Sequence, residues 1–339
     1  MGASPRMRIE MPRLDLGSSL LPRPLVEIAR EIREAGGSLY LVGGWVRDFL
    51  MDRPSQDYDL EVYGLDMEKL FNILVRHAKP NLVGKAFGII TMRMEGADFD
   101  FAFPRTENKI GPGHKGFSVQ PDSSLGFEQA SARRDFTINS MGIRIPDMEL
   151  VDCHGGNRDL KAGMLLHVSA AFSEDPLRAL RAVQFAARFE FDIHPDTREL
   201  CRKLPLAELP MERIYGEFKK LMLKAKRPSL GLEWMLRLDL LRHFPELGAL
   251  IGVQQEPEWH PEGDVWIHNN MVIDQAAKLR KEEYGEFDNM ALMLGALCHD
   301  FGKPLTTTFS EGRWRSPGHD VKGEAPTRSF LRTAKGSHR

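Results

Sequence analysis

The chain has 339 residues, more than one ordinary hydrophobic core holds, so two or three domains are expected. Apolar residues make up 42% and charged residues 28% of the sequence, as in soluble globular proteins, and no apolar run is long enough for a membrane span. The net charge of −2 excludes RNA binding through bulk charge, so any RNA site needs a local basic face.

Cysteine usage and the first residues bear on the cellular compartment. The three cysteines, Cys153, Cys201 and Cys298, are odd in number and far apart, which argues against a disulfide framework and against a zinc cluster. Residues 1–20 lack the apolar stretch of a signal peptide. The expected location is therefore the reducing cytoplasm, without membrane attachment.

The first predicted elements form a strand, a turn and a helix. Residues 39–42 are an apolar strand, and Gly43 and Gly44 make a turn without a Cβ to block a ligand. A helix that begins at Trp45 has free amides at its N-terminus, which favour an anion. Arg47 on its first turn is able to grip phosphate oxygens with two hydrogen bonds. The stretch predicts a phosphate-binding turn.

The next strand alternates acidic and apolar residues over residues 57–62. A period of two places Asp57, Asp59 and Glu61 on one face and the apolar residues on the other, toward a core. Two carboxylates about 7 Å apart on one strand face can share Mg²⁺ ions, which prefer oxygen ligands and substrate phosphates. The pattern predicts a magnesium site, and the plain alternative is a tight turn followed by a half-solvated strand.

A helix is expected over residues 67–77, with strands over 89–94 and 98–103. The second of these strands alternates again, with Asp98 and Asp100 on one side and phenylalanines on the other. Asp100 is therefore a candidate third acid beside the first pair, although a solvated strand face gives the same pattern.

A long polar connection and two charged motifs follow. Residues 105–129 are rich in Gly, Pro and Ser, and a connection of this length is usually a functional loop or a disordered one. In residues 132–141, ARRDFTINSM, two arginines and an aspartate precede an apolar helix start. In residues 152–160, DCHGGNRDL, we expect Asp152 and Asp159 to act as structural caps.

The next helix begins with Ser173 as N-cap and acids on its first turn. Asp175, Arg178 and Arg181 recur every three residues on one of its faces. On pattern alone, this is equally a salt-bridged solvated face. Helical patterns dominate from residue 227 onward.

Taken together, these motifs resemble the class II tRNA nucleotidyltransferase (CCA-adding enzyme) and poly(A) polymerase family. Its five motifs occur here in order: the Gly-Gly turn with Arg47 and the Asp57/Asp59 pair, residues 132–141, residues 152–160, E-D-x-x-R at 174–178, and residues 212–223, where Arg213 and Glu217 are expected to brace the neck. The resemblance covers residues 41–223.

The resemblance implies an α+β fold, in which a small mixed-sheet nucleotidyltransferase head is followed by an all-helical neck, a body and a partial HD-like domain. The expected segments are an N-terminal helical extension (1–37), the catalytic head (38–160), the neck that recognises the base (161–225), the body (226–266) and the partial HD-like domain (267–339).

The resemblance also implies the activity: addition of C, C and A to tRNA 3′ ends from CTP and ATP, by two-metal nucleotidyl transfer with Mg²⁺. The implied residues are Asp57 and Asp59 as metal ligands with Asp100 beside them as a third catalytic acid, and Gly44, Arg47, Arg134, Asp175, Arg178 and Arg181 as nucleotide contacts. Asp175 and Arg178 would pair with the Watson–Crick edge of the base. One position departs from the family, since Gln184 stands where members often carry another arginine.

The C-terminal histidines resemble a second superfamily. His268, followed by His299 and Asp300, is similar to the H…HD pattern of HD metal-dependent phosphohydrolases, and His319-Asp320 could add ligands. Imidazoles and a carboxylate suit a transition metal that activates water against a phosphoester. Histidines that only cap or pack helices are the alternative. The superfamily's final Asp has no assignable counterpart before residue 339, so a short domain with weak activity is expected.

Several functions stay open at this point. A CC-adding enzyme, an A-adding enzyme and a poly(A) polymerase share the same motifs. The resemblance implies that residues 105–129 are the flexible loop that helps switch nucleotide specificity in this family, and its full length here speaks against CC addition alone. An HD phosphohydrolase with a vestigial head and a non-catalytic RNA-binding protein are alternatives from other classes. The sequence leaves the added nucleotides and the oligomeric state undetermined.

Overall fold

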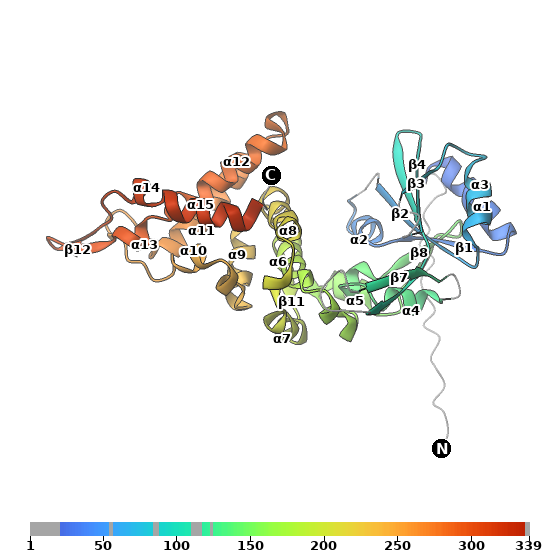
Figure 1. Cartoon of the computed structure of the whole chain (residues 1–339), viewed down its shortest axis with the longest axis horizontal. Helices are drawn as coiled ribbons and strands as arrows, with labels where there is room; N and C mark the ends of the chain where they lie inside the picture. Colours follow the sequence, from blue (N-terminus) through green and yellow to red (C-terminus); the bar gives the residue numbers. More distant parts are fainter. Residues whose placement is uncertain (1–20, 54–56, 84–87, 110–116, 123–124, 336–339) are drawn as a thin grey trace, which may run out of the picture. The chain divides into compact units, whose positions relative to one another are not determined.

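The computed structural model describes residues 21–53, 57–83, 88–109, 117–122 and 125–335 (Figure 1). The chain divides into two compact units, one of residues 1–162 and 166–172 and the other of residues 163–165 and 173–339. None of the helices within the described ranges is both long enough and apolar enough to span a bilayer.

The first unit is built on a seven-stranded mixed sheet, drawn in blue to green in Figure 1. Only β2 and β5 run parallel, and the other neighbouring strands are antiparallel. In spatial order the strands are β3 (Asn81–Val83), β4 (Ile89–Met94), β5 (Ala97–Ala102), β2 (Asp57–Tyr63), β1 (Ser38–Val42), β8 (Gly142–Ile145) and β9 (Glu149–Val151). The small mixed-sheet head is thereby confirmed.

The head helices are short. They are α1 (Arg23–Glu34), α2 (Gly44–Leu50), α3 (Met67–Leu74), α4 (Phe127–Ser131), the 3₁₀ turn η2 (Thr137–Asn139) and α5 (Gly156–Lys161). Helix α1 packs against β1 and α3 through its fully buried Leu25, Ile28 and Ile32.

Part of the predicted 105–129 connection is ordered as a strand pair. Strands β6 (Arg105–Lys109) and β7 (Phe117–Pro121) pair antiparallel in a separate two-stranded sheet. Residues 110–116, which connect them in the sequence, lie outside the described residues.

The predicted alternation of residues 57–62 is confirmed. Tyr58, Leu60 and Val62 are buried in the head core, and the ring of Tyr58 stacks on Phe99 of β5 with 4.7 Å between centroids. The apolar face therefore anchors the strand, and the acidic face is turned away from the core.

The second unit is mainly helical. Its helices are α6 (Leu177–Phe189), α7 (Pro195–Lys203), α8 (Met211–Lys224), α9 (Ser229–Arg237), α10 (Pro245–Gly248), α11 (Val265–Lys278), α12 (Gly285–Cys298), α13 (Lys303–Thr306), α14 (His319–Lys322) and α15 (Glu324–Lys335), with 3₁₀ turns η3 (Ala170–Glu174, starting in the first unit), η4 (Leu206–Glu208), η5 (Leu240–His243) and η6 (Glu282–Tyr284).

Two short strand pairs lie between these helices in the sequence. The sequence patterns do not reveal the strand pairs. Strand β10 (Met164–Leu165) pairs parallel with β11 (Asp192–Ile193), and β12 (Thr308–Ser310) pairs antiparallel with β13 (Arg313–Arg315). Helix α6 packs on α8 and α9, while α11 packs on α12. Strands of two or three residues are too short to leave a period of two in the sequence.

Candidate active site

The Gly-Gly turn between β1 and α2 brings three parts of the head together. Gly43 has φ 66° and ψ −134°, a backbone conformation that favours glycine. A Cβ on Gly43 would lie 3.1 Å from Nη1 of Arg134 and 3.6 Å from Oδ2 of Asp59. The turn, the acidic strand and the arginine of residues 132–141 therefore meet at one place.

The acids of β2 and β5 lie side by side on one face of the sheet. The parallel register pairs Asp57 with Asp98 and Asp59 with Asp100. Asp98, at the edge of this group, lies 3.8 Å from Arg93. The structure thus brings together the three predicted acids, two from one strand and one from the next.

The electrostatics of this face favour a bound cation. Burial raises the pKa of Asp59; Arg134 opposes the shift, and the nearby carboxylates of Asp100 and Asp57 add to it. Burial also raises the pKa of Asp100, and its acidic neighbours raise it further. Like charges held together and partly shielded from water bind a cation favourably.

Arg134 is held by contacts within the head. Its Nη2 donates to Oε1 of Glu61 at 2.6 Å, and its Nη1 donates to the carbonyl oxygen of Asn139 at 3.1 Å. Glu61 also accepts a 2.6 Å hydrogen bond from the hydroxyl of Tyr63. The third acid of the β2 alternation therefore serves to fix Arg134, which leaves Asp57 and Asp59 as the exposed pair of that strand.

Arg47 lies deeper than the sequence pattern predicts. Its side chain is buried, and its guanidinium donates to Oδ1 of Asn139 at 2.7 Å and to Asp48 at 2.8 Å. Asn139 in turn donates to Asp135 at 3.0 Å. Asn139 is the centre of this buried network, and sequence reasoning gave it no role. Contact of Arg47 or Gly44 with a nucleotide stays a prediction.

The third motif, residues 152–160, shapes the start of α5 and ties this helix to η2. Oδ1 and Oδ2 of Asp152 accept hydrogen bonds from the amides of His154, Gly156 and Asn157, as expected of a cap on α5. Asp159 instead accepts from the hydroxyl of Thr137 at 2.7 Å, which ties α5 to η2.

In the second unit, two of the three nucleotide contacts predicted at the start of α6, Asp175 and Arg181, pair with α8. Oδ2 of Asp175 accepts from Arg213 at 2.8 Å, while its Oδ1 accepts from the amide of Leu177 and so caps α6. Nη1 of Arg181 lies 3.7 Å from Oε1 of Glu217. The two α8 residues thus brace the neck by pairing with α6 side chains. The roles predicted for Asp175, Arg178 and Arg181 stay predictions.

A second cluster surrounds Asp300, in the part of the chain predicted to be HD-like. The Nε2 atoms of three histidines approach its carboxylate: His299 at 3.2 Å, His319 at 3.7 Å and His268 at 3.9 Å. The structure therefore brings together the predicted His268, His299 and Asp300 and adds His319.

The carboxylate of Asp300 is buried but incompletely satisfied. Nζ of Lys303 lies 2.8 Å from Oδ2, yet that oxygen accepts no well-aligned hydrogen bond from any residue that the structure describes. Burial raises the pKa of Asp300, but the contacts of His299 and Lys303 outweigh it and hold the pKa at about 2. Asp300 is thus an anion at neutral pH, and a bound cation would satisfy the oxygen that lacks a well-aligned hydrogen bond.

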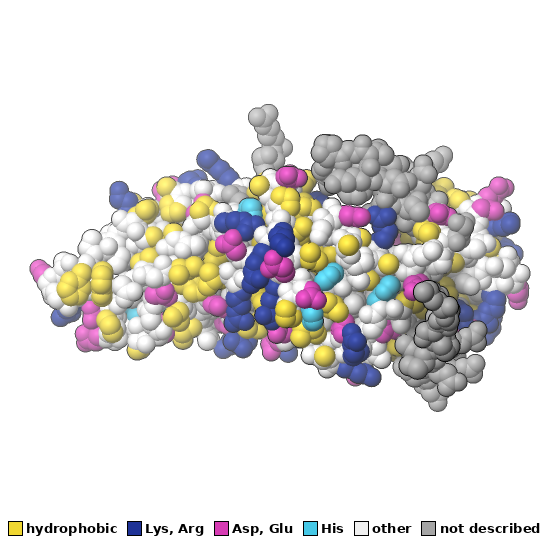
Figure 2. All heavy atoms as spheres, turned by 90° about the horizontal axis from the view of Figure 1, so that it is seen from below, with side chains coloured by type: hydrophobic (Ala, Val, Ile, Leu, Met, Phe, Trp, Pro, Cys, Tyr) yellow, Lys and Arg dark blue, Asp and Glu magenta, His cyan; other side chains and the backbone are white. Residues whose placement is uncertain are grey.

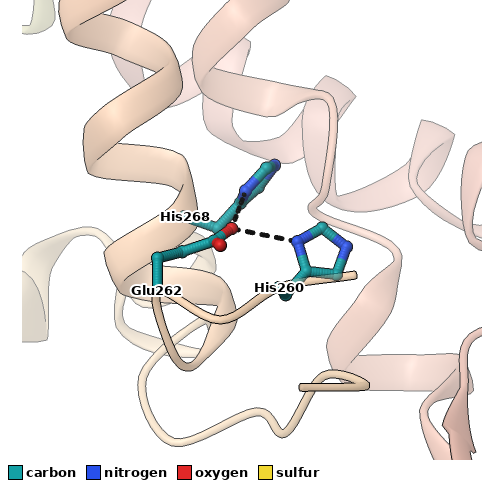
Figure 3. A group of neighbouring side chains, drawn as sticks. All are labelled: His260, Glu262 and His268. Atoms are coloured by element: carbon teal, nitrogen blue, oxygen red, sulfur yellow. Dashed lines mark hydrogen bonds and ion pairs between the residues drawn. The ribbon is translucent and has the colours of Figure 1, made fainter. Parts of the chain in front are cut away.

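Glu262 lies next to this cluster, between two imidazoles (Figure 3). Its Oε1 is 2.7 Å from Nδ1 of His268 and 3.0 Å from Nδ1 of His260. The bond from His260 is the main reason why the pKa of Glu262 is lowered, to about 2. Neither His260 nor Glu262 was singled out from the sequence, because both lie in a loop without a recognisable motif.

With the geometry in view, comparison with known proteins identifies the class. Residues 39–166 match the model of the poly A polymerase head domain, and residues 190–250 match a model described as the probable RNA and SrmB-binding site of polymerase A. The head, with its turn, acids and arginine, is that of a nucleotidyltransferase.

The chain belongs to the family of the bacterial multifunctional CCA proteins. It is 38% identical to the multifunctional CCA protein of Xylella fastidiosa (strain 9a5c) over 305 residues, which cover 87% of this chain and 69% of the relative. It is 39% identical to that of Xanthomonas euvesicatoria pv. vesicatoria (strain 85-10) over 307 residues, which cover 88% and 70%.

Solved structures agree with this assignment. A tRNA nucleotidyltransferase complexed with a primer tRNA and an incoming ATP analog has a TM-score of 0.55 and 26% identity, covering 78% of this chain and 80% of that one. A tRNA-processing enzyme with CTP has a TM-score of 0.54 and 26% identity, covering 78% and 73%.

Proposed function

We propose that the protein adds C, C and A to the 3′ ends of tRNA, using CTP and ATP and Mg²⁺, in the cytoplasm. The observation that carries the proposal is the acidic face of Asp57, Asp59 and Asp100 beside the Gly43 turn and Arg134, in a chain that belongs to the family of CCA proteins. None of its three cysteines forms a disulfide, in keeping with a reducing compartment.

The donor set fits Mg²⁺. Carboxylate oxygens are the ligands that this ion prefers, and burial, with added repulsion from neighbouring carboxylates, raises the pKa of Asp59 and of Asp100, which a bound cation would offset. When bound, the metal ions lower the pKa of the RNA 3′-hydroxyl and stabilise the pyrophosphate that leaves. The three acids of β2 and β5 would hold these ions at a fixed place on the rigid sheet.

The remaining head residues would hold the triphosphate. Helix α2 begins directly after the turn at Gly43, which has no Cβ to block a phosphate, and the first amides of a helix favour an anion. Arg134 lies at the same turn and is fixed by Glu61 and Asn139, so its guanidinium is oriented before the nucleotide binds. In this proposal Arg47 acts mainly through Asn139, which carries the backbone that Arg134 contacts.

The neck would read the base. A carboxylate accepts from the amino group that cytosine and adenine share, and a guanidinium donates to a ring acceptor. Asp175 and Arg178 supply this pair of groups at the start of α6, and the bond from Arg213 fixes the Asp175 carboxylate. The proposal assigns selectivity for C and A over U and G to these two residues.

A basic face in the second unit supports tRNA as the partner. Nη2 of Arg242 donates to the carbonyl of Arg202, Nη2 of Arg202 donates to that of Arg237, and Arg198 and Arg237 both pack on the ring of Trp234. Figure 2 shows a region of the surface where Lys and Arg side chains gather, with acids among them. Such local clustering provides phosphate contacts despite the net charge of −2.

A primer-extension experiment tests the proposal. The purified protein is incubated with tRNA that ends before CCA, with CTP, ATP, UTP or GTP alone and with CTP and ATP together, and the products are sequenced. We expect two C residues with CTP alone and a complete CCA end with both nucleotides. Extension by A alone, a stop after CC with both nucleotides, or a long A tail would contradict CCA addition.

A second function is supported by the cluster around Asp300. Three imidazole Nε2 atoms and one carboxylate form the kind of ligand set that binds a transition metal. We propose that His268, His299 and Asp300, with His319, hold such an ion and support hydrolysis of a phosphoester. His299→Ala should remove binding of Co²⁺ or Ni²⁺ without affecting nucleotide addition, and equal binding by the variant would contradict this site.

A further inference from the structure

His268 belongs to two groups of side chains that could each hold a metal ion. One contains His260 and Glu262, and the other contains His299 and Asp300. The two groups use opposite nitrogens of the His268 ring: Nδ1 faces Glu262, and Nε2 faces Asp300. A neutral imidazole has one lone pair and one N–H, so only one of the two nitrogens is able to bind a metal.

The distances distinguish the two groups. Ligand atoms on a tetrahedral ion with bonds of about 2.1 Å lie about 3.4 Å from one another. The Nε2 atoms around Asp300 lie 3.2, 3.7 and 3.9 Å from its oxygens, close to that spacing. Around Glu262 the distances are 2.7 and 3.0 Å, which are hydrogen-bond lengths. The metal-like spacing is therefore on the Nε2 side of His268.

The other two histidines also have a hydrogen-bond acceptor at Nδ1, which leaves Nε2 as the nitrogen for a metal ion. Nδ1 of His299 lies 2.8 Å from the carbonyl of Ala296, and Nδ1 of His319 lies 2.8 Å from the carbonyl of Ser316. A carbonyl only accepts, so both rings carry the proton on Nδ1 and present Nε2 toward Asp300. For His268 the acceptor on Nδ1 is instead the carboxylate of Glu262.

We propose that Glu262 is the positioning residue that keeps His268 in the tautomer with the proton on Nδ1 and so aims its Nε2 at the metal position beside Asp300. The inference rests on the metal site proposed above. His260 shares the same carboxylate oxygen and packs edge-on against the His268 ring, with 4.7 Å between centroids. Both imidazoles thus contact the one carboxylate (Figure 3).

Substitution of Glu262 should change the affinity for the metal ion and leave the number of metal ligands unchanged. Losing the carboxylate partner of a metal-bound histidine typically costs about 10–100-fold in metal affinity. We expect that loss in Glu262→Ala. In Glu262→Gln the side-chain carbonyl still accepts one N–H, so the affinity should lie between those of the wild type and the alanine variant. Glu258→Gln removes an exposed carboxylate from the same loop and serves as the matched control for charge.

The test is a Co²⁺ titration of the full chain in excess Mg²⁺, which keeps the head carboxylates occupied. Calorimetry gives the dissociation constant and the stoichiometry, and visible absorption at saturation reports the ligand set. Thermal melting checks that each variant is folded. His299→Ala identifies the signal from the site around Asp300, because it removes a ligand.

The outcomes separate the inference from the function on which it rests. The inference predicts affinity that decreases from wild type through Gln to Ala at position 262, with unchanged stoichiometry and an unchanged saturated spectrum. An altered saturated spectrum in Glu262→Gln would make Glu262 a ligand and overturn the positioning role, as would affinities equal to the wild type or matched by Glu258→Gln. A wild-type protein that binds no Co²⁺ would overturn the metal site itself, and the inference with it.

Discussion

At the scale of a single residue, the surroundings of Asp59 disfavour the charged form of its carboxylate. This lowers the stability of the head at neutral pH and favours a bound metal ion. Its side chain is exposed at the surface of the sheet, yet the protein atoms packed around the carboxylate raise its pKa, and three neighbouring acids raise it further. The guanidinium of Arg134 opposes the shift, but it is already bonded to Glu61. A charge held under these conditions binds a metal ion more strongly than a solvated carboxylate does.

Replacing Asp59 with alanine should therefore abolish nucleotide addition. The apolar face of β2 is untouched, so the fold should persist, and kcat should fall by more than tenfold, a barrier change above about 1.4 kcal/mol. Asp98→Ala is the control, because Asp98 lies on the same face but is paired with Arg93. Steady-state rates with CTP measure both. Equal rates in the two variants, or more than about a tenth of wild-type kcat in Asp59→Ala, would contradict the metal role.

The same residues show what a sequence reveals about a site. The face shared by Asp57 and Asp59 follows from a period of two, which is a local property of a strand. The bond between Arg134 and Glu61 joins positions 73 residues apart, and no local pattern encodes such a pairing. The deep position of Arg47 was missed for the same reason, since its partner Asn139 is 92 residues away.

At the scale of elements, α6 and α8 are coupled through their charged side chains. The i,i+3 spacing on α6 left open whether Asp175 belongs to a solvated salt-bridged face or to a template for the base. The structure adds a third fact, because Asp175 pairs with Arg213 of the other helix. Both functions of Asp175, bracing the helices and contacting a base, predict a loss of activity on substitution, so rate alone does not separate them.

Nucleotide selectivity separates them. Asp175→Ala should lose discrimination between CTP and UTP as well as rate, because a site that hydrogen-bonds the amino group leaves polar groups unpaired with the wrong base. Arg213→Ala removes the same ion pair from the α8 side and keeps the carboxylate. Competition assays with paired nucleotides measure the ratio. An equal loss of selectivity in both variants would show that Asp175 only links the two helices and does not contact the base.

The junction between α5 and η2 depends on the absence of one side chain. A Cβ on Gly156 would lie 2.1 Å from the carbonyl oxygen of Thr137 and 2.8 Å from the side chain of Met141. Real Cβ atoms do not approach so closely, so a larger residue must push the two elements apart.

Gly156→Ala should destabilise the head by about 2 kcal/mol, the cost of overpacking a core. Gly216→Ala is the control, since nothing lies within 4 Å of a Cβ at that helical position and alanine is the better helix former there. Thermal midpoints from calorimetry compare the two. A midpoint for Gly156→Ala that equals or exceeds the wild type would show that the junction tolerates the added methyl group.

Across the whole molecule, the three cysteines differ in exposure, and the two in the helical unit report on its folding. Cys201 and Cys298 are buried, and burial raises the pKa of each thiol to about 12. Cys153 is exposed, although burial of its sulfur and the nearby Glu128 and Asp152 raise its pKa as well. The thiolate is the reactive form, so exposure and pKa together set reactivity.

An aromatic disulfide reagent at pH 8 should therefore titrate one thiol of the native protein, and all three after denaturation. Because the pKa of Cys153 is raised, its rate should keep increasing as the pH goes from 8 to 9.5, where an ordinary thiol begins to level off. Cys153→Ser should leave no rapidly reacting thiol. Two or more rapidly reacting thiols in the native wild type would contradict the burial of Cys201 and Cys298.

The order of the domains could be predicted from the sequence, because each motif is a local pattern and the motifs follow one another. The division into units could not be predicted in detail. Residues 163–165 belong to the helical unit and residues 166–172 to the head, although they are consecutive. Their assignment depends on long-range contacts, such as the ring of Phe172 against Phe136 at 5.5 Å, and on the pairing of β10 with β11.

This interleaving restricts how the two units can be separated or recombined. The chain passes between them three times, after residues 162, 165 and 172. A head truncated at residue 162 would lose Leu166, whose carbonyl accepts from the amide of Thr137, and Phe172, which fills the core beside Phe136. Exchange of heads between relatives therefore requires matched sequences at three junctions, so gene fusion at a single breakpoint between the units would produce an incomplete core.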